Sequence, residues 1–330
     1  MRYRRIVIGV DFSTASLNAV RWVSTQMAPH AELHLAHVVS RPRMPSFLSS
    51  HGHLLDEQNA EEPTLYPGLA GFAGLAGARR AEVTVRRGQP ADELAALARE
   101  VDADLICVGR SQRRRGTGRF GATTPQRLLA RTKVSVLLVP HAPPHRVTRL
   151  LAAVSDGAEA QNVLQIAGML ADEWDARVDV LHALDPDTVV PSMSAPTLMR
   201  LTDAWLADRS AAMPRLKKRS NALGRIGDAA EAILTHASAA ESGLIVMGRR
   251  AVVEHGDENE GCVGSTTRLI TWTTPCPVLV VGRRSPDQPP HEQGAFRRAE
   301  LWNQTRTASG RRTGRRRSDA VVPPTGDDAA

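Results

Sequence analysis

The chain has 330 residues, of which 42 are lysine or arginine and 35 are aspartate or glutamate, for a formal net charge of +7. A hydrophobic fraction of 42% supplies a core and excludes a chain that is disordered throughout, and the length favours two domains. The longest apolar stretch, Leu69 to Ala78, is much shorter than the roughly 20 residues of a membrane helix, so no membrane span is expected. The apolar run behind the basic N-terminus ends at Asp11, unlike a secretory signal.

Most of the positive charge lies at the C-terminal end. The last 48 residues hold ten arginines and six acidic residues, and we predict that residues 285–330 form a disordered, Arg-rich tail. A basic total indicates nucleic-acid binding only when the charge lies on a folded face, so nucleic acid is expected as a partner only through this tail. The three cysteines are too few for a disulfide framework and suit a reducing compartment, which predicts a cytoplasmic protein.

The two halves of the chain repeat one another. Four blocks recur in the same order at offsets of 139 to 144 residues: 6–10 with 150–154, 88–93 with 227–232, 104–110 with 243–249, and 134–139 with 276–281. An ordered set of this kind indicates a duplicated domain of about 140 residues. We predict domains at residues 1–142 and 146–284, joined by the Pro-rich linker His141–His145.

The first repeat alternates strand and helix patterns. Continuous apolar or β-branched runs predict strands at 6–10, 32–39, 82–86, 105–108 and 134–139. Ser13 or Thr14 can cap a first helix with one apolar face, Pro90 opens a helix to about Val101, and a last helix begins at Thr124. Residues 40–80 predict only a broken helix.

The second repeat follows the same pattern from Arg149 to Gly282, with a weak third strand near 215–223. The prediction is therefore an α/β fold of two tandem, open, parallel five-stranded sheets with flanking helices, Rossmann-like in class.

In such sheets, ligands collect where the strands end and loops enter helix N-termini. The loops of interest follow Val10, the strand that ends at Val39, and Gly109. An aspartate just past a strand can accept hydrogen bonds from a ribose or a base, and a Gly-rich loop offers backbone N–H groups to phosphates. Asp11 can also act only as a charge at a helix N-terminus.

The ordered motifs resemble the universal stress protein family: strand-Asp-x-Ser at 11–13, Gly-x-Pro-Ala at 88–91, strand-Val-Gly at 108–109, and a long loop into Thr-x-Pro-Gln-Arg at 123–127. The resemblance covers residues 2–140 and 147–283, a tandem form, and implies the adenine-nucleotide α-hydrolase-like fold. It also implies an adenine nucleotide such as ATP, with Mg²⁺ accompanying it, as the ligand.

Family members that bind ATP carry a Gly-x2-Gly-x9-Gly-Ser/Thr pattern. At these positions the first repeat has Gly109, Gln112, Ala122 and Thr123, so the spacing is kept while two glycines are replaced; Gly121 lies one position early. The resemblance implies a binding site made of Val10, Asp11, Val38, Gly109, Arg110, Gly121, Ala122, Thr123 and Thr124. The resemblance also implies roles for individual residues. Asp11 would form a hydrogen bond to the ribose or the base, and Val38 would face the adenine ring. Gly109 would let the backbone approach the phosphates, Arg110 or its neighbours would neutralise the phosphates, and Thr123 and Thr124 would cap a helix whose N-terminus points at the phosphates.

The second repeat departs further from the pattern. Ser155 replaces the aspartate, Ala251 replaces the middle glycine, and the corresponding loop is longer and acidic, with Glu254, Asp257, Glu258 and Glu260. The first-repeat loop instead holds Arg110, Arg113, Arg114, Arg115 and Arg119. Because arginine attracts phosphate and carboxylates repel it, the first repeat is predicted to be the better nucleotide site and the second a degenerate one.

Other chemistries find little support. Gly116–Gly121 matches GxGxxG formally, but it follows the wrong strand and lacks the acidic partner of a dinucleotide site. His51, His53 and Asp56 indicate a surface cluster, and we expect no metal site. Without a paired acid and base, we expect a binding module rather than a dedicated enzyme, with slow ATP hydrolysis left open. The alternative is a scaffold that does not bind ATP and acts through a protein partner or a homodimer.

Overall fold

The computed structural model describes residues 3–40, 62–78, 80–110, 124–157, 159–185, 193–249, 251–252 and 262–282. The predicted tail at 285–330 and the cluster of His51, His53 and Asp56 lie outside these residues. None of the helices in the described ranges combines the length and hydropathy that a membrane span requires.

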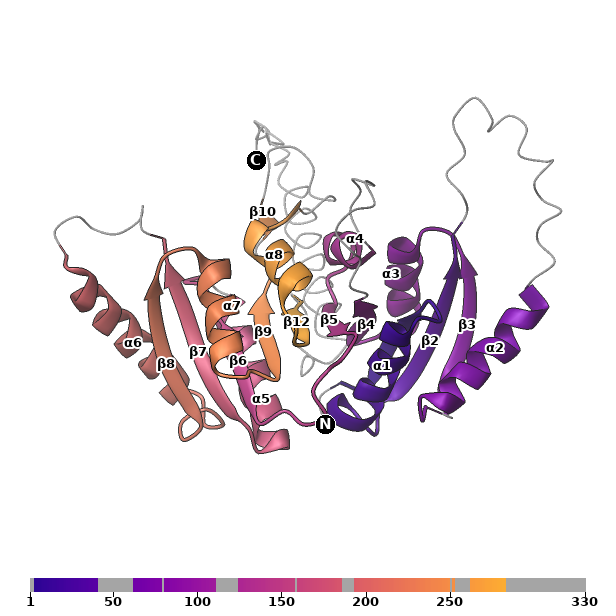
Figure 1. Ribbon diagram of the computed structural model, residues 1–330, viewed down its shortest axis with the longest axis horizontal. Coiled ribbons are helices and arrows are strands. Elements are labelled where there is room, and N and C mark those ends of the chain that lie inside the picture. Colours follow the sequence, from indigo (N-terminus) through magenta and orange to yellow (C-terminus); the bar gives the residue numbers. More distant parts are fainter. Residues whose placement is uncertain are drawn as a thin grey trace, which may run out of the picture. The chain divides into compact units, whose positions relative to one another are not determined.

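In the first repeat, strands and helices alternate as predicted (Figure 1). The elements are β1 (Arg5–Val10), α1 (Thr14–Trp22), the short π-helix η1 (Val23–Met27), β2 (Glu32–Val39), α2 (Glu62–Leu75), β3 (Glu82–Arg87), α3 (Pro90–Glu100), β4 (Leu105–Arg110), α4 (Thr124–Arg131) and β5 (Ser135–Pro140). Ser13 caps α1 by accepting a hydrogen bond from the Ser16 backbone N–H, which satisfies one of the donors left open at a helix start. The sequence therefore placed the start of this helix correctly.

The second repeat has the same order of elements and one addition. Its elements are β6 (Arg149–Ala153), α5 (Glu159–Trp174), β7 (Arg177–Leu184), α6 (Ala195–Ala211), β8 (Ser220–Ile226), α7 (Ala229–Ala239), β9 (Leu244–Gly248), the short pair β10 (Ala251–Val252) and β11 (Cys262–Val263), α8 (Ser265–Thr273) and β12 (Val278–Val281). The third strand, β8, begins later than the predicted 215–223. Residues 216–220 instead make turns that hydrogen-bond back to Met213 and Leu216.

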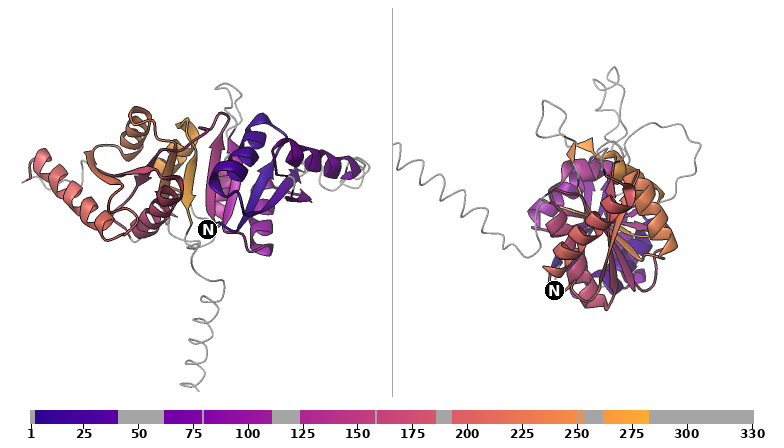
Figure 2. Two further views of the ribbon diagram at one scale, coloured as in Figure 1. Left: turned by 90° about the horizontal axis from the view of Figure 1, so that it is seen from below. Right: turned by 90° about the vertical axis from the view of Figure 1, so that its left-hand side faces the viewer.

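The α/β fold with five parallel strands in each tandem repeat is confirmed, and the strand order β3-β2-β1-β4-β5-β12-β9-β6-β7-β8 adds that the two sets of strands are joined. Each repeat contributes five parallel strands, and the two sets join through an antiparallel pairing in which Leu137 of β5 faces Leu279 of β12 (Figure 2). One ten-stranded sheet results, with the two last strands at its centre. Because β5 and β12 pair with each other, neither strand is available to a second chain.

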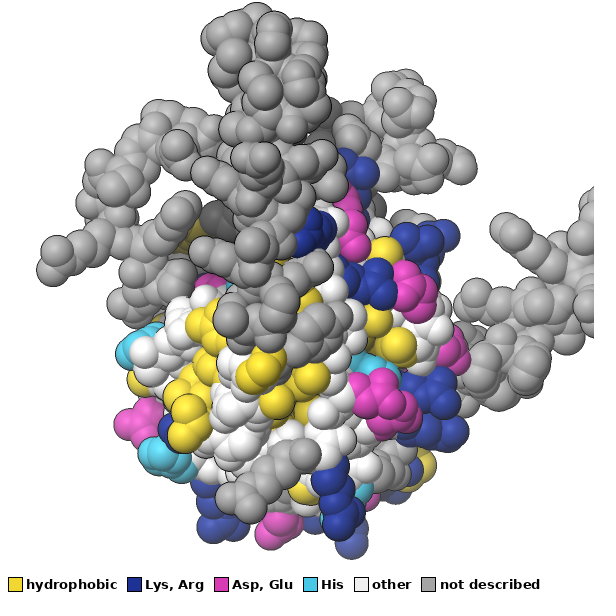
Figure 3. Space-filling view, turned by 90° about the vertical axis from the view of Figure 1, so that its right-hand side faces the viewer, with side chains coloured by type: hydrophobic (Ala, Val, Ile, Leu, Met, Phe, Trp, Pro, Cys, Tyr) yellow, Lys and Arg dark blue, Asp and Glu magenta, His cyan; other side chains and the backbone are white. Residues whose placement is uncertain are grey.

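Helices cover both faces of this sheet (Figure 1). Residues of α1, α2, α5 and α6 belong to one buried cluster, and residues of α3, α4, α7 and α8 belong to the other. The central strands are buried on both faces, as βαβ crossovers require, and they read as apolar runs in the sequence. On the outer side of α2, apolar side chains reach the surface; Leu75 is 70% exposed there (Figure 3).

Candidate functional site

The predicted site lies where the strand order reverses. In each repeat the first strand stands between the second and fourth strands, so the carboxyl ends of β1, β2 and β4, or of β6, β7 and β9, meet at one point. The strand registers match residues of the two repeats, with Val10 equivalent to Val154 and Val38 to Ala183. At this switch point, open α/β sheets characteristically bind their ligands.

A cavity of about 250 Å³ occupies this position in the second repeat, and we call it the second-repeat cavity. It is lined by Ala153, Val154, Ser155, Asp156, Glu159, Ala160, Val163, Leu181, His182, Ala183, Leu184, Asp185, Ala229, Ile233, Met247, Gly248, Thr266 and Thr267. Five of these residues are equivalents of Val10, Asp11, Val38, Gly109 and Thr124. The fold thus brings together five positions that the sequence had placed on three separate loops and a helix.

In the first repeat, Asp11 is part of the start of α1. Its Oδ1 accepts hydrogen bonds from the Ser13 backbone N–H at 3.1 Å and from the Ser13 hydroxyl at 2.5 Å. Partial desolvation opposes ionisation of this carboxyl, but interactions with Ser13 and Ser16 outweigh it, so the pKa of Asp11 lies below its ordinary value. Asp11 is therefore a carboxylate at neutral pH.

Gly109, the last residue but one of β4, packs against the first turn of α1. A Cβ at this position would lie 2.6 Å from both the Ala15 carbonyl carbon and the Ser16 nitrogen, closer than side-chain carbons approach a backbone. Glycine is required here because the helix start packs onto the strand end. The helix N-terminus is thereby held beside the place predicted for phosphates.

Arg110 makes contacts that the sequence did not predict. Its guanidinium donates to the carbonyl of Thr271 at 2.7 Å and to that of Thr274, both at the end of α8 in the second repeat. Burial lowers the pKa of this guanidinium, and the carbonyls replace the water it has lost. The structure thus engages the Arg110 side chain between the repeats, and the assignment of phosphate neutralisation to Arg110 or its neighbours stays a prediction.

The equivalent arginine makes the reciprocal contact. Arg249, which follows Gly248, donates to the carbonyls of Thr132 and Val134 at the end of α4 in the first repeat. The remaining predicted residues Gly121, Ala122 and Thr123, and the arginines at 113–115 and 119, lie outside the described part of the chain. Thr124 is the first residue of α4.

Comparison with known proteins settles the family. The model of the universal stress protein family matches residues 2–140 and again residues 146–282. The chain belongs to the universal stress protein family. The two matches confirm the tandem form that the internal repeat predicted.

Solved universal stress proteins share the fold over most of the chain. A universal stress protein from Archaeoglobus fulgidus DSM 4304 is 18% identical, with a TM-score of 0.62 over 85% of this chain and 98% of that one. A functionally unknown protein from Pseudomonas aeruginosa PAO1 is 16% identical, with a TM-score of 0.53 over 84% and 92%. At these identities the likeness establishes the fold alone. No curated protein matches the chain.

One feature of this universal stress protein escaped the sequence analysis. The Nδ1 atom of His37 lies 2.7 Å from the Val10 carbonyl oxygen, and Nδ1 of the equivalent His182 lies 2.8 Å from that of Val154. Each imidazole thus ties the end of the second strand to the end of the first, beside the predicted site. The signal was a histidine at the same place in both repeats, 145 residues apart.

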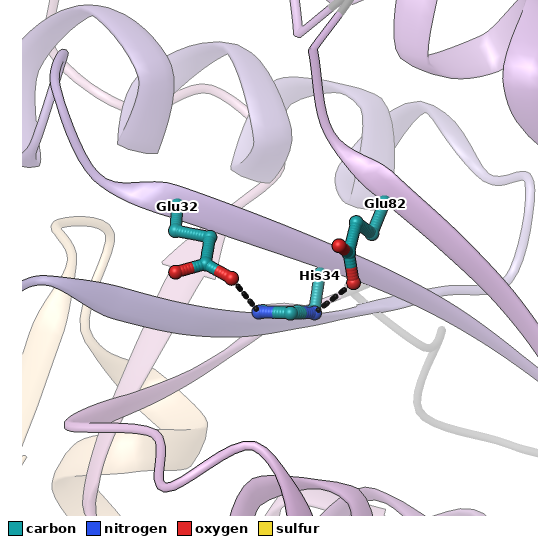
Figure 4. A group of neighbouring side chains, drawn as sticks. All are labelled: Glu32, His34 and Glu82. Carbon is teal, nitrogen blue, oxygen red and sulfur yellow. Dashed lines mark ion pairs between the residues drawn. The ribbon is translucent and has the colours of Figure 1, made fainter.

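A second cluster lies at the amino-terminal ends of β2 and β3, at the opposite ends of the strands from the predicted ligand site (Figure 4). The buried ring of His34 places Nε2 at 3.2 Å from a Glu32 oxygen and Nδ1 at 3.1 Å from a Glu82 oxygen. The two ring nitrogens face different carboxylates, so the His34 ring joins Glu32 of its own strand to Glu82 of the neighbouring strand. We therefore interpret the cluster as a link between β3 and β2, separate from the ligand site.

Proposed function

We propose that this universal stress protein is a cytoplasmic stress-response module that binds ATP or another adenine nucleotide, mainly in its first repeat. The proposal includes no catalytic step. It rests on the position of the predicted residues at the sheet's switch point and on the difference in charge between the repeats.

The charge difference is the observation that carries the choice of repeat. Asp156, Glu159 and Asp185 line the second-repeat cavity, whereas Phe12, Ala15 and Ser40 hold the equivalent positions in the first repeat. The loop after Gly109 adds arginines at 113–115 and 119, and the loop after Gly248 adds four carboxylates. A triphosphate carries several negative charges, so it is attracted to the first site and repelled from the second.

In the proposed complex, each first-repeat residue has a defined role. The Asp11 carboxylate accepts a hydrogen bond from the ribose or base, and Val38 lies against adenine. Gly109 allows the backbone to approach the phosphates, beside the N-termini of α1 and α4, whose unpaired N–H groups favour anions. Of Arg110 and its neighbours, the arginines after residue 112 neutralise the phosphates, because Arg110 is engaged with carbonyls of the second repeat, and Mg²⁺ accompanies the nucleotide.

Isothermal titration of the full chain with Mg-ATP tests the proposal. We expect one saturable site, an affinity at least about tenfold lower for Asp11→Ala, and an unchanged affinity for the matched second-repeat variant Ser155→Ala. Mass spectrometry of the purified protein for co-purifying nucleotide gives an independent check. No binding by the wild type, or an Asp11→Ala affinity equal to that of the wild type, would refute the assignment.

A scaffold that acts through a protein partner is the second candidate. The exposed apolar side of α2, with Leu75 at the surface, favours it (Figure 3). The titration separates the two functions, because a scaffold with empty sites gives no saturable heat with ATP.

A further inference from the structure

The second-repeat cavity has an apolar floor. Ala153 and Leu181 contribute from the strands, Val163 from α5, Ile233 from α7, and Met247 from β9. All five side chains are buried by their neighbours. At about 250 Å³, the cavity lies just below the roughly 300–1,000 Å³ of common small-molecule sites, so it suits a small ligand with an apolar body.

The rim of this cavity is acidic. Asp156 and Glu159 contribute at the end of β6 and the start of α5, and Asp185 contributes at the end of β7. No lysine or arginine occurs among the described residues that line the cavity. Three carboxylates around one small opening lower the energy of a cation inside it and raise that of an anion.

The Glu159 side chain also lies against Gly248, the equivalent of Gly109. A Cβ added at Gly248 would lie 3.1 Å from Oε2 of Glu159, which puts the carboxylate group directly over the glycine backbone. In the first repeat, the equivalent glycine contacts the backbone at Ala15 and Ser16 instead. The second repeat therefore has a carboxylate oxygen beside this glycine, where the first repeat has helix backbone, and a negative charge there disfavours a phosphate.

The three rim acids are particular to the second repeat, whereas the equivalent site of the first repeat has one carboxylate, Asp11, where the second has Ser155. The equivalents of the three rim acids are Phe12, Ala15 and Ser40, which carry no charge. Because the two repeats share the fold and the strand register, the fold itself does not require these carboxylates. Their gathering around a cavity with an apolar floor indicates a ligand of the opposite charge.

We propose that the second-repeat cavity binds a small organic cation, a planar or apolar body that carries an ammonium group and no phosphate. The body buries its apolar surface against the floor, and the ammonium group donates charge-assisted hydrogen bonds to the rim carboxylates. This site is independent of the proposed nucleotide site, so each proposal can fail without the other.

Calorimetric titration of the full chain with tryptamine tests the charge preference, because indole-3-acetate offers the same ring with a negative charge. We expect saturable binding of tryptamine that weakens as salt is raised from 50 to 500 mM, and at least about tenfold weaker binding of indole-3-acetate. Adenosine serves as an uncharged probe of similar planarity. Equal or tighter binding of adenosine or indole-3-acetate overturns the proposal, as does the absence of binding by both tryptamine and benzylamine at millimolar concentration.

Charge-removing variants locate the binding site. Asp156→Asn and Glu159→Gln keep the shape of each side chain, and each is expected to weaken tryptamine binding by about three- to tenfold without changing ATP affinity. Asp11→Asn is the matched control in the first repeat and should leave tryptamine binding unchanged. If both second-repeat variants melt like the wild type and bind tryptamine as tightly, or if Asp11→Asn abolishes binding, the cavity is not the site.

Discussion

At the scale of single residues, the same side chain often serves the fold and the site together. Asp11 accepts two hydrogen bonds from Ser13 at the start of α1, and we also propose it as the acceptor for the nucleotide. The sequence could identify Asp11, because an aspartate after an apolar run has a local signature. The sequence could not identify the hydrogen-bond partners of Arg110, because the carbonyls that accept its hydrogen bonds are more than 160 residues away.

Asp179 gives a residue-scale prediction about stability. Its side chain is 3% exposed and lies 3.1 Å from Arg149 and 2.9 Å from His236. Arg149 is 37% exposed and its charge stays in contact with water, so the main loss in Asp179→Ala is that of two hydrogen bonds to a buried carboxylate, which should lower the free energy of unfolding by about 1.5–3 kcal/mol. Urea denaturation of the full chain measures this difference in the free energy of unfolding between the variant and the wild type.

The matched control is Asp175→Asn, which breaks the exposed pair with Arg219 at 2.5 Å and keeps a residue that tolerates the backbone φ of 52° at this position. An exposed pair contributes about 0–1 kcal/mol, so this variant should unfold close to the wild-type midpoint. Similar losses in both variants would show that burial does not determine the contribution of Asp179.

At the scale of elements, the sequence predicted the strands that are buried on both faces and was least accurate at the sheet margin. β8 is an edge strand that pairs only with β7, and most of its residues are only partly buried. An edge strand needs fewer apolar residues, so the sequence Ser220–Ile226 lacks the continuous apolar run that identified the central strands. The short pair of β10 and β11 was missed for a related reason: two-residue strands have no detectable periodicity.

The packing of α1 on β4 gives an element-scale prediction. In Gly109→Ala, the new Cβ meets backbone atoms of α1 that cannot move alone, so overpacking should cost about 1–3 kcal/mol of unfolding free energy. In Gly248→Ala, the nearest atom is the end of the flexible Glu159 side chain at 3.1 Å, so the cost should stay below about 1 kcal/mol. Thermal denaturation of the two variants compares them directly, and an equal cost would contradict the described packing of α1.

At the scale of the whole molecule, the ten-stranded sheet depends on contacts between the two repeats that no sequence motif predicts. The repeat offset predicted two similar units, but the β5–β12 pairing consists of backbone hydrogen bonds between them. The reciprocal contacts of Arg110 and Arg249 with the ends of α8 and α4 flank this pairing. The charge difference between the two sites, in contrast, was visible in the sequence, because it depends only on residue type.

The arginine contacts predict a separation of stability from binding. Arg110→Ala and Arg249→Ala should each lower the free energy of unfolding by about 1–3 kcal/mol, because buried carbonyls lose their charged donors. Neither substitution should change ATP affinity by more than about twofold, since neither side chain faces the nucleotide. A large loss of ATP affinity in Arg110→Ala, together with wild-type stability, would contradict this prediction and identify Arg110 as a phosphate ligand.

The central claim is that the first repeat holds the nucleotide. Photoaffinity labelling of the full chain with 8-azido-ATP, followed by peptide mapping, tests it most directly. The account predicts labelled peptides from the ends of β1, β2 and β4, protected by unlabelled ATP and not by tryptamine. Labelling confined to the ends of β6, β7 and β9, around Ser155 and Ala183, would contradict it.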